Sequence, residues 1–360
     1  MPPRCLDRRP APYRSSCMPR RYVVSLLLLA VALSSDSSFA GESNATTGTV
    51  EFAPVGDESA IPARFRLPAA EFRYRQEPQP TRGTVMSVSK VTFPSPVVTP
   101  HPNNNTVHCE YFCPTAEGTR PGVIVLHILG GDFDLARLFC RALAGRGVAA
   151  LFLKMPYYGE RREPGVDVRM ISLDPEQTVS GMTQAVLDIR RAAAWLASRP
   201  EIDEDQIGIM GISLGGITSA LAVSLEPRFH KAAFLLAGGD MGQVAWSSTE
   251  MAELREHWTS LGRTKEELFE TLRPIDPVTY ARPVAGREIL MLNASNDEVV
   301  PPECTKSLWR AFGEPEIVWW DAGHYTAVRY LGQGAMRVVE FFEPESANAE
   351  ESADAARAGR

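Results

Sequence analysis

The fold of this chain is decided by the stretch QIGIMGISLG, residues 206–215. Residues 206–212 form an apolar run of the kind found in a strand buried within a parallel sheet, and a helix-forming stretch, 214–225, follows. Between them lies the pattern Gly-x-Ser-x-Gly, a turn so tight that its serine is strained and its neighbours must be small. A Gly-rich nucleotide-binding turn would instead need Gly-x-Gly-x-x-Gly in the first unit, which is absent. Ser213 is therefore the candidate nucleophile, held at the N-terminus of a helix whose dipole favours developing negative charge.

Predicted strands and helices alternate on both sides of this stretch. Strands are expected at 84–93, 106–112, 122–127, 148–153, 206–212, 232–236, 288–292 and 316–320, and helices at 134–144, 176–198, 214–225, 302–312 and 327–342. This alternation predicts an α/β fold, a mainly parallel twisted sheet with helices on both faces and its ligand site at the carboxyl ends of the strands. Between the late strands, capping-box patterns at Ser247 and Thr264 predict inserted helices that form a wall or partial lid beside the site.

The beginning of the chain has the composition of a targeting segment. An apolar stretch at 22–33, preceded by Arg20 and Arg21, predicts a signal peptide over residues 1–40 and export to the periplasm or the cell exterior. The arginine pair leaves twin-arginine export open. The apolar stretch is short for a membrane span, which disfavours the alternative of an uncleaved anchor. The long basic segment before Met18 leaves that methionine open as the true start.

Three segments follow the predicted signal peptide. Residues 41–82 are rich in Pro, Gly, Ser and Thr, which predicts a weakly ordered arm. Residues 83–343 hold the alternating strands and helices and form one predicted catalytic domain. The acidic segment 344–360 is expected to be a disordered tail.

Charge and cysteine content narrow the function classes. Six Arg and two Asp leave with residues 1–40, so 31 basic and 42 acidic residues remain, a formal net charge of −11. So acidic a chain without a basic stripe is a poor nucleic-acid binder.

Cys109 and Cys113 lie on one predicted strand, about 13 Å apart, so they should not bridge each other. The pairing of these two with Cys140 and Cys304 stays open, and no spacing indicates a metal or cofactor.

Residues 84–342 resemble the α/β-hydrolase superfamily in the order of their elements around Gly211-Ile212-Ser213-Leu214-Gly215. Within it, the chain is most similar to the dienelactone-hydrolase and acyl-esterase branches. Dienelactone hydrolases use a cysteine nucleophile, so the serine here favours ester hydrolysis. The resemblance implies catalytic groups in the chain order Ser, Asp, His.

Two late strands lead into residues that match this order. The strand at 289–293 leads to Asp297, and the strand at 317–320 leads to His324. A serine hydroxyl is a weak nucleophile until a base takes its proton, and imidazole suits this because its ordinary pKa is near 6.5. His324 is therefore the candidate base, and Asp297 is the carboxylate expected to orient its ring.

The sequence contains other candidates for the acid and the base. Asp240, after an earlier strand, and Glu298, beside Asp297, are alternative acids, whereas Asp321 is too near the histidine in sequence. His127 ends a strand and is expected to be structural.

The resemblance also implies an oxyanion hole made of two backbone N–H groups. One is expected from Leu214, directly after the nucleophile. The other is expected from the loop 127–132, which resembles a His-Gly-x-Gly loop with Ile128 in place of its first glycine. Leu129 is the favoured donor there.

The motif MPYYGERR, residues 155–162, follows the next strand and is expected at the rim of the site. We predict that Tyr157 or Tyr158 packs on the substrate, or that Arg161 pairs with a substrate carboxylate. The alternative is a plain surface loop with an internal Glu–Arg pair.

These expectations define a carboxylic-ester hydrolase with a Ser-His-Asp triad, acting on a small-molecule or carbohydrate-linked ester, plant or algal polysaccharide esters among them. No cofactor, no nucleic acid and no membrane span after signal cleavage are expected. Acyl transfer and peptide hydrolysis are the alternatives that use the same acyl-enzyme. A catalytically silent binding protein of this fold is the alternative from another class. The natural ester and the oligomeric state are left open.

Overall fold

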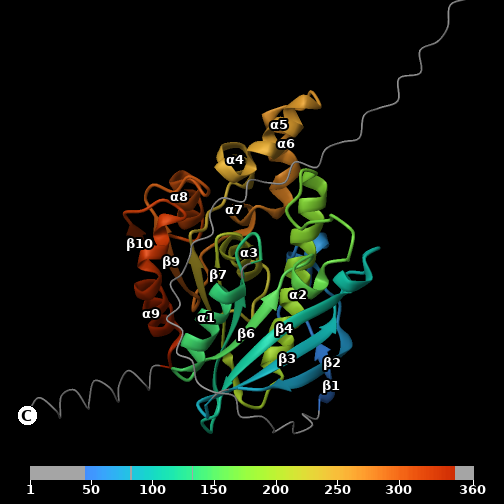
Figure 1. The fold of residues 1–360 in the computed structure, drawn as a ribbon, viewed down its shortest axis with the longest axis vertical. Coiled ribbons are helices and arrows are strands. Elements are labelled where there is room, and N and C mark those ends of the chain that lie inside the picture. The colour runs from blue at the N-terminus through green and yellow to red at the C-terminus, as the bar shows by residue number, and fades with distance from the viewer. Residues whose placement is uncertain (1–44, 82, 132, 345–360) are drawn as a thin grey trace, which may run out of the picture. The chain divides into compact units, whose positions relative to one another are not determined.

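The structure, a computed structural model, describes residues 45–81, 83–131 and 133–344 (Figure 1). The predicted signal peptide and all but the first residue of the predicted tail lie outside these ranges.

The described strands form one sheet in the order β1-β2-β3-β4-β6-β5-β7-β8-β9-β10. Strands β5 to β10 run parallel to one another, and β1 to β4 are antiparallel and join them through β4 and β6. Their bounds are β1 Thr46–Phe52, β2 Ala70–Gln79, β3 Met86–Pro94, β4 Thr106–Pro114, β5 Arg120–Leu126, β6 Ala149–Lys154, β7 Ile202–Ile212, β8 Lys231–Leu235, β9 Glu288–Ala294 and β10 Glu316–Trp320.

The parallel strands are apolar along their length because both faces of the sheet are covered. Every residue of β5 is buried. Side chains alternate between the faces of a strand, so Val123 and Val125 enter one hydrophobic core while Ile124 and Leu126 enter the other.

Helices cover both faces of this sheet, as Figure 1 shows. Helices α2, α3 and α8 contribute buried residues to one core, and α1 and α9 contribute to the other. The predicted α/β-hydrolase fold, a mainly parallel sheet with helices on both faces, is confirmed. The helix bounds are α1 Phe133–Ala144, α2 Pro175–Ala197, α3 Leu214–Val223, α4 Met241–Ser247, α5 Ala252–Ser260, α6 Lys265–Leu272, α7 Pro277–Tyr280, α8 Pro302–Ala311 and α9 Leu331–Phe342.

The prediction of a weakly ordered arm over 41–82 was wrong for most of that segment. It contributes β1 and β2, which pair with each other along β1 and continue the sheet beyond β3. Phe52 and Phe72 from these strands are buried in the core, with 0% and 4% exposure. These buried side chains show that the segment has an apolar face. Its content of Pro, Gly, Ser and Thr did not indicate this.

The predicted insertion lies between β8 and β9 and consists of α4, α5, α6 and α7. Figure 1 shows α4, α5 and α6 gathered beyond one end of the sheet. Thr264 and Glu267 form the predicted capping box at the start of α6. Ser247 instead ends α4, and its neighbour Ser248 caps the turn that follows.

Within residues 45–344, apart from 82 and 132, the helices are all too short or too polar to cross a membrane. The four cysteines described there, Cys109, Cys113, Cys140 and Cys304, are free thiols. Three of them are buried, and burial raises the pKa of the Cys304 thiol to about 12.

Candidate active site

Ser213 lies on the turn between β7 and α3, at the carboxyl end of the central strands. Its backbone is strained, with φ 54° and ψ −117°, a region that non-glycine residues rarely occupy. The flanking glycines leave room for this turn. A Cβ on Gly211 would lie 2.3 Å from the Gly215 backbone, and a Cβ on Gly215 would lie 2.6 Å from the His127 carbonyl oxygen.

His324 follows β10 and Asp297 follows β9, and the structure brings both to Ser213. The Nε2 of His324 lies 3.0 Å from the Ser213 Oγ. The Nδ1 of His324 lies 2.8 Å from the Asp297 Oδ2 and 3.0 Å from its Oδ1. A carboxylate can only accept, so Nδ1 carries the proton and Nε2 is free to accept one from the serine hydroxyl.

Asp297 is itself held in place by the backbone. Its Oδ1 accepts hydrogen bonds from the N–H groups of Val299, at 2.9 Å, and Val300, at 2.7 Å. The side chains of Asp297 and His324 are 3% and 9% exposed. The carboxylate is therefore fixed in orientation and shielded from water.

The alternative acids occupy other positions. Asp240 begins α4 in a left-handed conformation, and its backbone N–H donates to Asp276. Asp321 accepts from the Asn296 side chain. Among the acids considered, the side chain that meets the His324 ring is that of Asp297.

Glu298 holds the histidine loop, a role that the sequence did not indicate. Its Oε2 accepts the backbone N–H of His324 at 3.0 Å. Its carbonyl accepts the N–H of Thr249, in the insertion, at 3.2 Å. The hydroxyl of Tyr325 bonds to the carboxylate of Glu250 as well. The insertion is thus attached to the loop that carries His324.

The two expected oxyanion donors, Leu214 and Leu129, follow the neighbouring parallel strands β7 and β5. Leu214 is the first residue of α3, where backbone N–H groups have no partner within the helix. Leu129 lies in the loop after β5, two residues after His127. The His127 Nδ1 donates to the Ile128 carbonyl at 2.8 Å, and its Nε2 accepts the Met155 N–H at 3.1 Å. Burial lowers the pKa of His127 to about 4, so its ring is neutral at pH 7.

The rim prediction was wrong for Arg161. Its side chain is fully buried and pairs with Asp188 at 2.7 Å, so it cannot reach a substrate carboxylate. Tyr157 and Tyr158 are also buried, with 7% and 6% exposure. The alternative of an internal Glu–Arg pair was wrong too, because Glu160 pairs with Lys154. The Arg161 side chain turns inward because buried hydrogen-bond acceptors lie within reach of its guanidinium.

In the described part of the chain, His, Cys, Asp and Glu side chains form no group of three or more able to hold a metal ion. The site itself holds a hydroxyl, an imidazole and a carboxylate in hydrogen-bonded series.

Two family models match the chain, and the two matches overlap in the segment that contains Ser213. Residues 182–315 match the prolyl oligopeptidase family, Peptidase_S9, and residues 82–238 match the family described as alpha/beta hydrolase domain containing 18.

Two uncharacterized proteins of Mycobacterium tuberculosis (strain ATCC 25618 / H37Rv) share sequence with the chain. Rv2627c is 31% identical over 180 residues, which cover 47% of this chain and 40% of the relative. Rv2307c is 25% identical over 239 residues, which cover 66% of this chain and 74% of the relative. The chain therefore spans about two fifths of the length of the first of these proteins.

Solved structures of acetyl xylan esterases have a similar fold. Acetyl xylan esterase 1 from Thermoanaerobacterium sp. JW/SL YS485 superposes with a TM-score of 0.60 at 20% identity, covering 75% of this chain and 88% of the other. The acetyl xylan esterase from Paenibacillus sp. R4 gives 0.56 at 20% identity, covering 74% and 88%. At such identity the likeness is one of fold.

The sheet, the strand–turn–helix unit around Ser213 and these matches show that the chain belongs to the α/β-hydrolase superfamily. The matches support a serine hydrolase. The finer placement beside dienelactone hydrolases stays a prediction.

Proposed function

We propose that this chain is a carboxylic-ester hydrolase that works through an acyl-enzyme on Ser213. The observation that carries the proposal is the hydrogen-bonded series from the Asp297 carboxylate through His324 to the Ser213 Oγ, at 2.8 Å and 3.0 Å. Such a series is the arrangement that turns a serine hydroxyl into a nucleophile.

In the proposed acylation step, His324 Nε2 takes the hydroxyl proton while Oγ of Ser213 bonds to the ester carbonyl carbon. The carbonyl electron pair moves onto its oxygen, and that charge is stabilised by the N–H groups of Leu214 and Leu129. The tetrahedral intermediate then collapses, the bond to the leaving oxygen breaks, and His324 gives its proton to the departing alcohol. Asp297 stabilises the imidazolium between these events.

Deacylation repeats the sequence with water as the nucleophile. His324 takes a proton from water, the hydroxide oxygen attacks the acyl carbon, and the proton returns to the Ser213 oxygen as the acid is released. Acyl transfer differs only in that an alcohol replaces water. Acyl transfer would require that water be excluded from the acyl-enzyme, and the insertion beside the His324 loop is the part of the chain placed to do this.

For the substrate we propose esters whose alcohol part is a small molecule or a carbohydrate. The fold likeness to acetyl xylan esterases supports this class, and the acidic net charge of the chain supports a neutral or cationic substrate over an anionic one.

Peptide hydrolysis is the second candidate, favoured by the match of residues 182–315 to the prolyl oligopeptidase family. Export to the periplasm or cell exterior stays a prediction, since it rests on residues 1–40.

The proposed function is tested by measuring kcat/KM for p-nitrophenyl acetate, acetylated xylo-oligosaccharides and matched peptide anilides. We expect turnover of the esters that falls by roughly 10⁶ in Ser213→Ala, the scale of nucleophile removal in such triads. Faster turnover of anilides than of esters with the same acyl group would favour peptide hydrolysis. Ester turnover unchanged in Ser213→Ala would refute the mechanism.

A further inference from the structure

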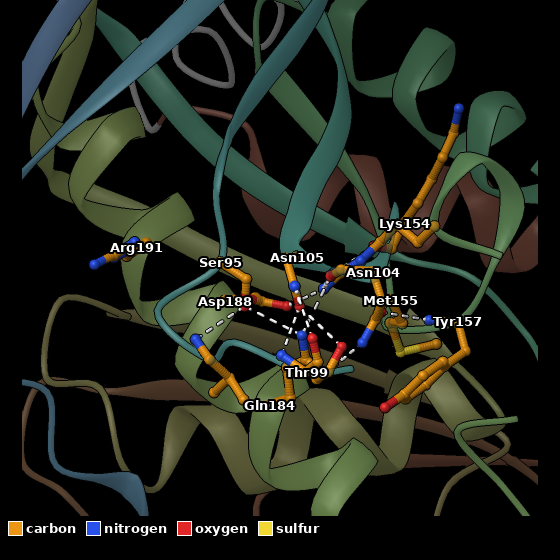
Figure 2. Close-up of polar contacts among 12 residues, drawn as sticks. Ser95, Thr99, Asn104, Asn105, Lys154, Met155, Tyr157, Gln184, Asp188 and Arg191 are labelled. Atoms are coloured by element: carbon orange, nitrogen blue, oxygen red, sulfur yellow. Dashed lines mark hydrogen bonds and ion pairs between the residues drawn. The ribbon is translucent and has the colours of Figure 1, made fainter. Parts of the chain in front are cut away.

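A ring of buried polar side chains contacts the loop 155–162, and Figure 2 shows Ser95, Asn104, Gln184 and Asp188 from it. We name it the buried polar ring. Each member hydrogen-bonds to the next, and none is more than 5% exposed. Its members are Ser95, Asn104, Arg161, Gln184 and Asp188.

The distances show that this ring is closed. The Ser95 Oγ donates to the Asp188 Oδ1 at 2.6 Å and accepts from the Gln184 Nε2 at 3.2 Å. The Gln184 Oε1 accepts from the Asn104 Nδ2 at 2.8 Å. Arg161 closes the ring, because its Nη2 donates to the Asn104 carbonyl at 2.8 Å and to the Asp188 Oδ2 at 2.7 Å.

Stability alone does not account for an ion pair in this position. Taking two charges out of water is costly, and apolar residues of similar volume often serve as well. What an apolar pair cannot do is fix several backbone segments at once. The Arg161 guanidinium does so, since it also donates to the Lys154 carbonyl at 3.1 Å, at the end of β6.

The segment held in this way is strained. Tyr157 has φ 65°, which a bulky residue adopts only when its surroundings impose it. Its N–H donates to the Asn104 Oδ1 at 2.9 Å, so the ring acts on this backbone directly. Figure 2 shows Asn104 and Tyr157 joined in this way.

The other side of the strained loop contacts the loop after β5. The Tyr158 ring lies 4.5 Å from the His127 ring, centroid to centroid, and a Cβ on Gly131 would come within 3.0 Å of it. Burial raises the pKa of the Tyr158 hydroxyl to about 12, so this side chain is neutral at pH 7. The Met155 N–H donates to the His127 Nε2 at 3.1 Å.

Because His127 is held in this way, its ring can fix the orientation of the peptide between Ile128 and Leu129. Its Nδ1 holds the Ile128 carbonyl at 2.8 Å. In a trans peptide the C=O and the following N–H point in opposite directions. Fixing the Ile128 carbonyl therefore fixes the direction of the Leu129 N–H.

We propose that Arg161 and Asp188 are positioning residues for the oxyanion hole: their buried pair holds the loop 155–162 so that Met155 and Tyr158 fix His127, which aims the Leu129 N–H. This proposal rests on the proposed function, because it assigns Leu129 as a donor in the same reaction.

The test uses the double variant Arg161→Met/Asp188→Leu, which leaves no unpaired buried charge. A control is Arg190→Met/Glu226→Leu, which removes another ion pair with 0% exposed side chains. That pair contacts Glu58 of the N-terminal segment and Arg228 instead of the loop 155–162. The kcat of both variants is calculated per active site. The concentration of active sites is determined from the burst of p-nitrophenol released from p-nitrophenyl acetate. Arg161→Lys is included to look for partial rescue.

We expect kcat of the Arg161/Asp188 variant to fall by about 10-fold to 100-fold with KM within about twofold, because a displaced donor costs less than the 10²–10³ of a removed one. The inhibition constant of a trifluoromethyl ketone, which forms a tetrahedral adduct, should rise by the same factor. The acid limb of the pH–rate profile should not move, since the His324–Asp297 pair is untouched. The control should keep the wild-type kcat.

Amide hydrogen exchange of the peptide covering residues 127–135 gives a readout without substrate. It should speed up at least tenfold in the Arg161/Asp188 variant and not in the control. Unchanged exchange together with unchanged kcat would overturn the proposal, and so would an equal loss of kcat in the control. If wild type hydrolysed no ester while exchange still responded, the proposed function would fail and the coupling between the loops would stand.

Discussion

The Nε2 of His324 lies 3.0 Å from the Oγ of Ser213, although 111 residues separate them in the chain. Parallel strands make this meeting possible, because β7 and β10 both end at the same edge of the sheet. Asp297, after β9, completes the series on the far side of the imidazole.

The identity of the acid is tested by comparing Asp297→Asn with Asp240→Asn. Asparagine at 297 can favour the wrong tautomer of His324, so kcat for p-nitrophenyl acetate should fall by about 10⁴. Asp240→Asn should stay within about threefold of wild type, because the contact that Asp240 makes with Asp276 is through its backbone N–H. Equal losses in the two variants would contradict the assignment.

His127 should make the protein less stable in mild acid. Burial lowers its pKa to about 4 in the folded chain, whereas in the unfolded chain it titrates near 6.5. The unfolded state therefore binds the proton first, and stability falls as pH drops from about 6.5 to about 4. From pH 7 to pH 5 this one group should remove roughly 2 kcal/mol of unfolding free energy.

Urea unfolding of wild type and His127→Gln at pH 7 and pH 5 checks this. The variant should be less stable at pH 7 and should lose less on acidification. A drop equally steep in both proteins would show that His127 titrates normally in the folded state.

The N-terminal strands should depend on Arg190. Its guanidinium is fully buried and pairs with Glu58 at 2.7 Å and Glu226 at 3.1 Å. Arg190→Met leaves the buried Glu226 carboxylate with Arg228 as its remaining charged partner, so the free energy of unfolding should fall by up to about 3–5 kcal/mol. Arg75→Ala, which breaks the exposed pair with Glu77, should cost less than about 1 kcal/mol.

Chemical denaturation at pH 7 gives both values. If Arg190→Met were as mild as Arg75→Ala, the buried pair would not hold the N-terminal segment.

Gly215 should tolerate no side chain. A Cβ there would lie 2.6 Å from the backbone oxygens of Leu126 and His127, neither of which can move without shifting β5. Gly215→Ala should therefore cost about 1–3 kcal/mol or more through overpacking and should lower kcat as well. Gly332→Ala, in α9 with open space around it, should be neutral or stabilising by about 0.5–1 kcal/mol. Thermal unfolding compares the two, and equal melting temperatures would contradict the steric argument.

The sequence predicted the strands of the parallel sheet and the residues that meet at its edge, because each buried strand is an apolar run followed by a turn. It did not predict β2, where Phe72 and Tyr74 alternate with charged residues but Pro78 and the surrounding loops obscure the pattern. The alternation of apolar and charged residues was the signal that could have found it.

The prediction for Arg161 in the rim motif, residues 155–162, was wrong for a different reason. An arginine in a loop ordinarily faces water, and nothing near Arg161 in the sequence indicates that its partner is Asp188, on α2. Glu298 is a similar case, since its acceptor role depends on where the backbone of His324 arrives. Such partners are set by the packing of distant elements and become visible only in the folded chain.

The most direct test of the central claim is peptide mapping by mass spectrometry after treatment with a fluorophosphonate. The account predicts one adduct, on the peptide that carries Ser213, absent in Ser213→Ala and formed far more slowly in His324→Ala. An adduct on another residue, or labelling of Ser213 at the wild-type rate without His324, would contradict it.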